Sequence, residues 1–295
     1  MEPDERILVP VDGSDGSERA SRHALAIAAA SGAAVDFLHV VTTGGRRSLG
    51  TRLDPEMARV RGDTVLGTAG RLADAADIEV TTERVEGRPP EEILAYATAR
   101  DSHLVVMSRR GASRAGTRLL GGVTDKVLRA SERPVLVVPP GDQSDPEDVA
   151  YERILLPTDG SECAAAAAAP CAALATAFGA TVHVVSAVGV GEAAGPVDEP
   201  TDPGSVDDRW RARAEAAVEG MVDRLTAAAD LPVERAVVRG RPADALREYV
   251  EANDVDAVAM GAHGRGPLSR WVLGSVTDRL LRTVDVPILV VRENA

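Results

Sequence analysis

The feature that most constrains this chain is an internal repeat. The segment Arg6–Ser14 reads RILVPVDGS and recurs as RILLPTDGS at Arg153–Ser161, an offset of 147 residues. Later segments, such as Gly87-Arg-Pro and Val123-Thr-Asp, recur at an offset of 153. A repeat of this length is a complete domain with room for its own hydrophobic core, rather than one unit of a solenoid. The chain of 295 residues should therefore fold as two similar domains.

Each copy alternates short β-branched runs with longer alanine-rich amphipathic segments. This alternation is typical of βαβ units, which build a parallel sheet covered by helices on both faces. We expect two doubly wound α/β domains, residues 1–139 and 151–295, joined by a linker at 140–150. Each should have four helices and five strands, with strands near residues 7–11, 35–41, 78–85, 104–107 and 135–138, and near 154–157, 182–188, 233–238, 257–260 and 288–291.

Three residues in the first helical segment of the second copy carry structural predictions. Pro170 follows a run of alanines, where it should kink the helix or end its first segment. Cys163 and Cys171 are spaced eight apart, which matches neither a CxxC pair nor a zinc ligand set. We interpret both cysteines as small buried thiols.

Charge and hydropathy exclude several classes of function. The formal net charge of -13 disfavours sequence-independent binding to nucleic acid or to an anionic membrane surface. No apolar run approaches the roughly 20 residues that span a bilayer, and residues 1–5 are acidic where a signal peptide would be basic. These observations predict a cytoplasmic protein with no membrane or nucleic-acid partner.

The strongest candidate site lies after the fourth strand of the second copy. Gly261 and Gly264 are followed, after nine residues, by Gly274 and Ser275 at the start of a helix. Ligands of open parallel sheets bind at the carboxyl ends of the strands, and free N–H groups at a helix start favour an anion. The spacing thus indicates a phosphate cradle, or a helix capped by Ser275 with Asp278 as its capping-box partner. The two roles can coexist.

Asp12 and Asp159 end the first strand of each copy, directly before Gly-Ser. An aspartate there could contact a ligand, cap the following helix or serve in catalysis. No second carboxylate lies at a readable spacing, so we favour ligand contact or capping. His263 could touch a phosphate, His39 should pack near the end of strand two, and Trp271 fits loop packing or a contact surface.

Taken together, these motifs resemble the universal stress protein family in tandem, over nearly the whole chain. The strand-ending Pro-x-Asp-Gly-Ser, Gly-Arg-Pro, and Gly-x2-Gly-x9-Gly-Ser before Val-Thr-Asp carry the resemblance. It implies strand order 3-2-1-4-5, and ATP bound by the glycine motif in one branch of the family. Residues that the resemblance places at the nucleotide of the second copy are Asp159 and Ala187 by the adenosine, Gly261 and Gly264 by ribose and phosphate, and Gly274, Ser275 and Val276 on the phosphates.

The first copy departs from this pattern. Ser108 and Gly122 replace Gly261 and Ser275, whereas Gly111 and Gly121 keep the other two glycines. A Cβ at Ser108 is expected to crowd the close approach, so the matching site, Asp12, Val40, Ser108, Gly111, Gly121 and Gly122, should be the weaker one. Arg109 and Arg110 could compensate with charge, or be solvated loop residues.

The leading hypothesis is a stress protein that binds ATP, with or without Mg²⁺ or Mn²⁺, as a regulatory ligand. A slow ATPase and a nucleotide-independent interaction scaffold are the alternatives. No protein ligand of a metal is readable from the motifs, and hydrolysis should be incidental because neither a catalytic lysine nor a carboxylate pair is visible in the sequence. We also expect the two copies to pack as a pseudo-dimer through their fifth strands, with a homodimer as a further option.

Overall fold

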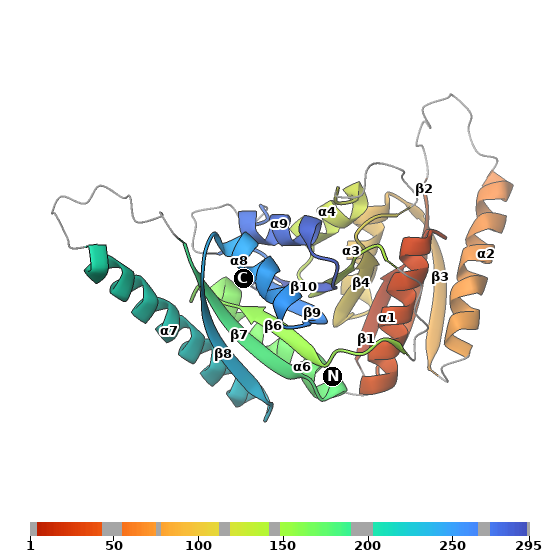
Figure 1. Cartoon of the computed structure of the whole chain (residues 1–295). Helices are drawn as coiled ribbons and strands as arrows, with labels where there is room; N and C mark the ends of the chain where they lie inside the picture. The colour runs from red at the N-terminus through yellow and green to blue at the C-terminus, as the bar shows by residue number, and fades with distance from the viewer. Residues whose placement is uncertain are drawn as a thin grey trace. The chain divides into compact units, whose positions relative to one another are not determined.

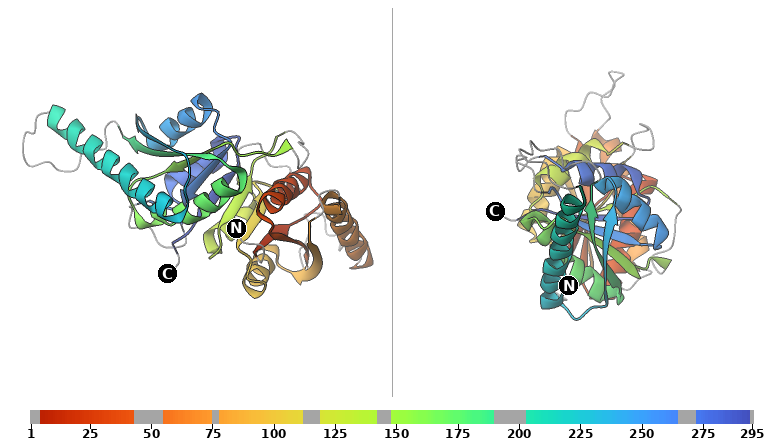
Figure 2. Two further views of the ribbon diagram at one scale, coloured as in Figure 1. Left: turned by 90° about the horizontal axis from the view of Figure 1, so that it is seen from below. Right: turned by 60° about the vertical axis from the view of Figure 1, so that its left-hand side comes forward.

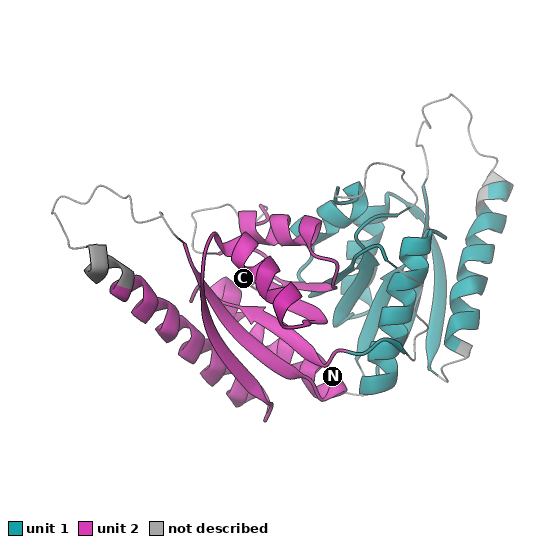
Figure 3. Ribbon diagram, in the orientation of Figure 1, with its two compact units in different colours: residues 1–150 teal, residues 151–295 magenta. Residues whose placement is uncertain are grey.

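The computed structural model describes residues 5–42, 55–74, 78–111, 119–141, 148–189, 203–264 and 272–293. The chain divides into two compact units, residues 1–150 and 151–295 (Figure 3). Each unit is an α/β domain with its own parallel sheet.

Unit 1 has the strand order β3-β2-β1-β4-β5 with every neighbouring pair parallel (Figure 1). Helices α1 and α2 contact each other on one face of this sheet, and α3 and α4 contact each other on the other face. Its elements are β1 Arg6–Pro10, α1 Asp15–Ser31, β2 Ala34–Thr42, α2 Pro55–Asp74, β3 Val80–Gly87, α3 Pro89–Ala99, β4 Leu104–Ser108, α4 Gly122–Ala130 and β5 Val135–Val138.

Unit 2 repeats this topology in the order β8-β7-β6-β9-β10. The same pairing of helices recurs, α6 with α7 and α8 with α9 (Figure 2). Its elements are β6 Arg153–Pro157, α5 Glu162–Ala165, α6 Ala168–Phe178, β7 Thr181–Val188, α7 Pro203–Ala228, β8 Val233–Arg239, α8 Pro242–Ala252, β9 Ala257–Gly261, α9 Ser275–Thr283 and β10 Ile288–Val291. The predicted doubly wound fold with strand order 3-2-1-4-5 is confirmed in both units.

The central strands are buried on both faces, as helix-covered parallel strands must be. Ile7, Leu8 and Val9 of β1 and Ile154, Leu155 and Leu156 of β6 are all inaccessible to solvent. The outer strands β3 and β8 contain only exposed and half-buried residues, because each lies at the edge of its unit's set of strands. The hydrophobic core of each unit therefore centres on its first strand, whose carboxyl end leads into the candidate site.

Pro170 accounts for the extra helical segment of unit 2. A proline inside a helix donates no hydrogen bond and clashes with the carbonyl four residues earlier, here Ala166. The helix stops at Ala165 and resumes at Ala168, so that Pro170 lies in the first turn of α6. The predicted interruption is confirmed, and unit 2 has two segments where unit 1 has the single helix α1.

Both units bury polar groups at one position of the second strand. In unit 1 the Asp36 carboxylate is fully buried and lies 2.8 Å from Arg6 Nη1 and 3.6 Å from Arg100 Nε. In unit 2 the same position is His183, whose Nδ1 lies 3.0 Å from the Tyr249 hydroxyl. Burial lowers the pKa of His183, which favours the neutral ring. Equivalent positions of the repeat thus pair a buried polar side chain in different ways, with arginines in unit 1 and with a tyrosine hydroxyl in unit 2.

Within the described part of the chain, no helix is both long and apolar enough to cross a membrane.

Candidate functional site

The turn after the first strand presents an aspartate in each unit. In unit 2 the Ser161 N–H donates to Asp159 Oδ1 over 2.9 Å, and Ser161 Oγ accepts from the Ala164 N–H over 3.2 Å. In unit 1 the Ser14 N–H donates to Asp12 Oδ1 over 3.0 Å, and Ser14 is the N-cap of α1. The serine therefore caps the helix in each unit, and the expectation that the aspartate does so is wrong.

Each aspartate keeps a second carboxylate oxygen that faces the glycine loop after the fourth strand. A Cβ built on Gly264 would lie 2.5 Å from Asp159 Oδ2, and a Cβ built on Gly111 would collide with Asp12 Oδ2 in the same way. Real Cβ atoms are not found this close to another heavy atom. The structure thus brings together two parts of the predicted site that are about a hundred residues apart in sequence, and a side chain at the loop position would have to displace the aspartate carboxylate.

Backbone hydrogen bonds shape the rest of the loop in unit 2. The Ala262 N–H donates to the Val291 carbonyl over 2.7 Å, and the Gly274 N–H donates back to the Ala262 carbonyl over 2.8 Å. A Cβ on Gly274 would lie 3.0 Å from His263 Cα, so this contact between the two glycine segments also depends on a missing side chain. The two glycine segments, at Gly264 and Gly274, therefore pack main chain against main chain.

The start of α9 completes this surface. Gly274 is the N-cap with extended backbone and makes no side-chain cap, while Ser275 is the exposed first residue of the helix. The predicted capping box of Ser275 with Asp278 is therefore wrong, because Asp278 instead pairs with Arg282 through two hydrogen bonds. The first N–H groups of a helix have no partner within the helix, so Ser275 and Val276 present donors that suit an anion.

The threonine of the repeated Val-Thr-Asp motif has a role that the sequence analysis did not assign. Thr277 Oγ1 donates to the Gly261 carbonyl over 3.0 Å, and Thr124 Oγ1 donates to the Ser108 carbonyl over 2.9 Å. Both threonines are buried. Each fastens the first turn of its helix to the end of the fourth strand. The repetition of this motif in both copies was the signal that could have identified it.

Unit 1 keeps the same backbone framework despite its different residues. The Arg109 N–H donates to the Val138 carbonyl over 2.7 Å, and the Gly121 N–H donates to the Arg109 carbonyl over 2.9 Å. Gly121 is the N-cap of α4, as Gly274 is of α9. Gly122, which replaces Ser275, has open space around its missing Cβ. The described ends of the unit 1 loop thus keep the same main-chain hydrogen bonds as unit 2, while the hydroxyl of Ser275 has no counterpart at Gly122.

The Cβ at the first loop position points toward the first helix of its unit. A Cβ built on Gly261 would lie 2.5 Å from the Cys163 carbonyl oxygen. In unit 1 the actual Cβ of Ser108 lies beside α1, where Gly16 takes the place of Cys163. The predicted crowding of a ligand by Ser108 is therefore wrong in its physical reason, because this side chain is directed at the helix.

Cys163 and His263 lie together beneath the unit 2 loop. Cys163 Sγ is 3.6 Å from His263 Nδ1, and Cys163 is nearly inaccessible to solvent. Both cysteines are unpaired and buried, as predicted. Arg292, which follows β10, has a pKa lowered by burial, although the nearby Cys163 acts in the opposite direction. His263 therefore has a packing partner in the protein through its Nδ1.

The remaining predicted residues occupy the same edge of each sheet. Ala187 and Val40 are half-buried near the carboxyl ends of β7 and β2, the strands next to β6 and β1. His39 is buried, with its Nδ1 2.8 Å from the Val11 carbonyl oxygen, so its predicted packing role is confirmed. Trp271 lies outside the described residues.

Metal binding finds little support among side chains in the described ranges. They contain no group of three or more histidine, cysteine, aspartate or glutamate residues arranged for a metal ion. Asp159 supplies a single carboxylate at the loop. A divalent cation would thus need most of its ligands from phosphate oxygens and water, which is the usual situation for Mg²⁺ at nucleotides.

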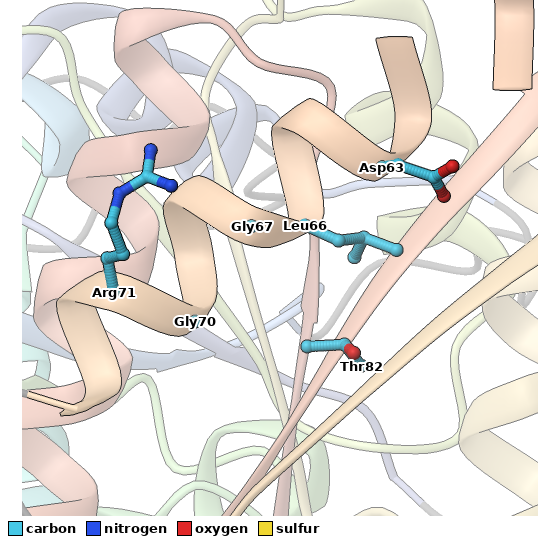
Figure 4. A pocket seen from close by; sticks show the side chains of 6 residues that line it. All are labelled: Asp63, Leu66, Gly67, Gly70, Arg71 and Thr82. Carbon is cyan, nitrogen blue, oxygen red and sulfur yellow. The ribbon is translucent and has the colours of Figure 1, made fainter. Parts of the chain in front are cut away.

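A separate hollow lies elsewhere in unit 1. It has a volume of about 420 Å³ between α2 and β3, with Leu66 and Thr82 in its wall and Asp63 and Arg71 at opposite ends (Figure 4). Its two charged residues already have partners, Arg84 for Asp63 and Thr68 for Arg71. No loop glycine lines it. We therefore favour the glycine loops as the functional site, since they combine exposed backbone donors with a carboxylate.

Comparison with known proteins agrees with the repeat. The sequence profile of the universal stress protein family matches residues 5–139 and again residues 150–292. A universal stress protein of Mycolicibacterium smegmatis is 28% identical over 300 residues, which cover 97% of this chain and 96% of the relative. Another, from Synechocystis, is 22% identical and covers 97% of this chain and 99% of the relative.

Solved structures agree on the fold. The crystal structure of a universal stress protein from Archaeoglobus fulgidus superposes with a TM-score of 0.70 at 20% identity, and the match covers 99% of this chain and 98% of that one. The family profile covers nearly all of both units. The chain therefore belongs to the universal stress protein family, with one family domain in each half.

Proposed function

We propose that unit 2 binds an adenine nucleotide, with ATP as the leading candidate, as a regulatory ligand in a stress response. The observation that carries the proposal is that Gly274, packed against the main chain of the loop, places the exposed start of α9 beside the exposed Gly264. A phosphate fits such a surface because N–H groups of a loop and a helix start provide several donors without a side chain in the way. A cytoplasmic location, where ATP is abundant, suits this role.

Asp159 gives the site its second chemical feature. Its Oδ1 accepts a hydrogen bond from the Ser161 N–H, and its Oδ2 lies next to Gly264 of the loop. A carboxylate there would repel a phosphate directly in contact with it, but would accept a hydrogen bond from a ribose hydroxyl or an adenine amino group. We infer that Asp159 contacts the nucleoside and that the phosphates lie toward Ser275 and Val276. A Mg²⁺ ion would supply charge neutralisation of the phosphates when bound.

Titration calorimetry of the full chain with ATP, ADP, AMP and cyclic AMP tests the proposal. We expect binding in the micromolar to millimolar range and its loss from unit 2 in Gly264→Val and in Gly274→Val. A side chain at Gly264 would displace the Asp159 carboxylate, and one at Gly274 would collide with the main chain of His263. Gly220→Val is the matched control, since a Cβ at Gly220 in α7 meets nothing within 4 Å. Unchanged titrations for both loop variants would refute the assignment of the site.

A further inference from the structure

Unit 2 places a thiol and an imidazole side by side. Cys163 lies in α5 and His263 lies two residues beyond the end of β9, so the pair joins segments that are 100 residues apart in sequence. Cys163 Sγ is 3.6 Å from His263 Nδ1, which is a hydrogen-bond distance for sulfur. A cysteine beside a histidine is the arrangement that makes a thiol nucleophilic, because the imidazole can accept the thiol proton.

The main chain brings these two side chains together. β9 ends at Gly261, and a Cβ built on this glycine would lie 2.5 Å from the Cys163 carbonyl oxygen. The missing side chain therefore allows α5 to approach the end of β9 closely. The Ala262 N–H donates to the Val291 carbonyl over 2.7 Å, which fixes the main chain just before His263. The short distance between thiol and imidazole thus depends on the packing of the main chain.

The charges around the Cys163 sulfur are those that accompany reactive thiols. Arg292, which follows β10, lies close enough for its charge to interact with Cys163. The neighbouring carboxylate in α5, Glu162, is already paired with Arg224 of α7. Reactive cysteines of proteins occur beside cationic and imidazole groups, because the thiolate is the nucleophile. Cys163 thus has an imidazole and a guanidinium nearby, and the carboxylate beside it in sequence has its own partner.

The second cysteine of the chain provides the contrast. Cys171 of α6 is fully buried, and burial raises the pKa of its thiol to about 12. A thiol in such surroundings is inert toward oxidants. In unit 1 the positions of Cys163 and His263 hold Gly16 and Arg110, so neither member of the pair is repeated there. The pair is therefore specific to unit 2.

We propose that Cys163 is a site of oxidation by hydrogen peroxide, with His263 as the group that accepts the thiol proton. The Sγ proton passes to His263 Nδ1, and the sulfur attacks one oxygen of the peroxide. The S–O bond forms as the O–O bond breaks, and the leaving hydroxide takes a proton from the imidazolium to become water. The sulfur is oxidised by two electrons to a sulfenic acid, and the peroxide is reduced.

The limited exposure of Cys163 favours a small oxidant. The residue is 3% exposed, whereas His263 is half-buried. Hydrogen peroxide is little larger than water, but glutathione or the thiol of another protein would need a wide opening to form a mixed disulfide with this sulfur. The expected product is therefore a sulfenic acid, which adds one oxygen atom at the contact between α5 and the loop of unit 2.

Tandem mass spectrometry, which fragments the chain between the two cysteines, measures their oxidation separately. The folded protein is treated with hydrogen peroxide at pH 7, the peroxide is removed with catalase, and the chain is unfolded in dimedone, which traps sulfenic acid. We expect the adduct on Cys163 to form at least about tenfold faster than the adduct on Cys171. Equal rates at the two cysteines, or no adduct on Cys163, would overturn the proposal.

His263→Gln tests the role of the imidazole, because glutamine is polar and of similar size but takes up no proton at neutral pH. Oxidation of Cys163 should slow by roughly tenfold or more at pH 7. It should also rise more steeply from pH 7 to pH 9 than in the wild type, since the thiol must then give its proton to hydroxide. Cys171 reports on folding in the same sample and should stay unmodified.

His103→Gln is the matched control, since it removes a histidine of unit 1 and should leave the oxidation of Cys163 unchanged. An unchanged rate and pH profile in His263→Gln would show that the imidazole does not accept the thiol proton. Equal slowing in both histidine variants would contradict the proposal as well.

Discussion

His23 should make the stability of unit 1 depend on pH. It lies half-buried in α1, and burial together with the positive charge of Arg19 lowers its pKa from 6.5 to about 4. The unfolded chain therefore takes up a proton at His23 between these two values, while the folded chain does not. Because the folded pKa is the lower one, the free energy of unfolding is highest above pH 6.5 and falls as the pH drops toward 4.

The size of the effect follows from the two pKa values. A difference of about 2.5 pKa units corresponds to roughly 3 kcal/mol once the pH is below both values, and to about 2 kcal/mol at pH 5. Urea unfolding of the wild type and of His23→Gln, at pH 7 and at pH 5, isolates this contribution from the other titrating groups. The wild type should lose about 2 kcal/mol more than the variant over this interval.

The difference in stability between wild type and His23→Gln has an internal control above pH 7. Above pH 7 the His23 ring is neutral in both the folded and the unfolded chain, so the difference between wild type and variant should stay constant there. An equal loss of stability in both proteins between pH 7 and pH 5 would show that burial in α1 does not suppress protonation of His23.

Other predictions follow from buried charge, buried thiols and the composition of the loop. Arg6→Ala removes the 2.8 Å partner of the fully buried Asp36 carboxylate and should cost about 3 to 5 kcal/mol in urea unfolding, whereas Arg211→Ala, which breaks an exposed pair with Glu215, should change stability by no more than about 0.5 kcal/mol. Burial raises the pKa of Cys171 to about 12, so mass spectrometry should find it unlabelled by iodoacetamide at pH 8 in the folded protein and labelled in denaturant; labelling at equal rates would contradict its burial. Steady-state ATP hydrolysis should stay below about one turnover per second, because backbone donors bind ground state and transition state alike. A faster rate that Asp159→Asn abolishes would favour an enzyme.

Much of the fold could be predicted because both copies of the repeat show the apolar strands that a helix-covered parallel sheet requires. A strand such as Val135–Val138 is apolar on both faces only when helices cover both, so its position in the sequence matched the structure residue for residue. The helix interruption before Pro170 could be predicted for the same reason, since a proline acts on its own helix within about four residues. These features depend on neighbours within a few residues, which the sequence displays.

The site was harder to predict where it depends on backbone conformation. Ser275 and Asp278 have the spacing of a capping box, yet the residue with extended backbone is Gly274, one position earlier. Asp12 and Asp159 likewise precede a serine that is the true cap in each unit. From the sequence alone, several consecutive residues could each be the N-cap. Tertiary contacts decide which of them is, here the hydrogen bond from the Gly274 N–H to the Ala262 carbonyl.

The contact between Gly16 and Ser108 lies beyond such local patterns because it joins residues far apart in the chain. Taken alone, Ser108 is a defect in a glycine motif and Gly16 is an unremarked residue in a helix. Aligning the two copies nevertheless shows two opposite exchanges, glycine for cysteine and serine for glycine. In unit 1 a Cβ on Gly16 would lie 3.0 Å from Ser108 Cβ, and in unit 2 a Cβ on Gly261 would lie 2.5 Å from the Cys163 carbonyl oxygen, so the close packing that sets both residues is visible only in the fold.

The two loops show which part of the repeat tolerates a change of residue. Their described main-chain hydrogen bonds agree in length, whereas the side chains beside them differ in size and polarity. Main-chain donors stay in place when a nearby side chain changes, provided that the backbone keeps its path. Each unit therefore has its own side-chain support on the same main-chain frame, a hydroxyl in unit 1 and a thiol with an imidazole in unit 2.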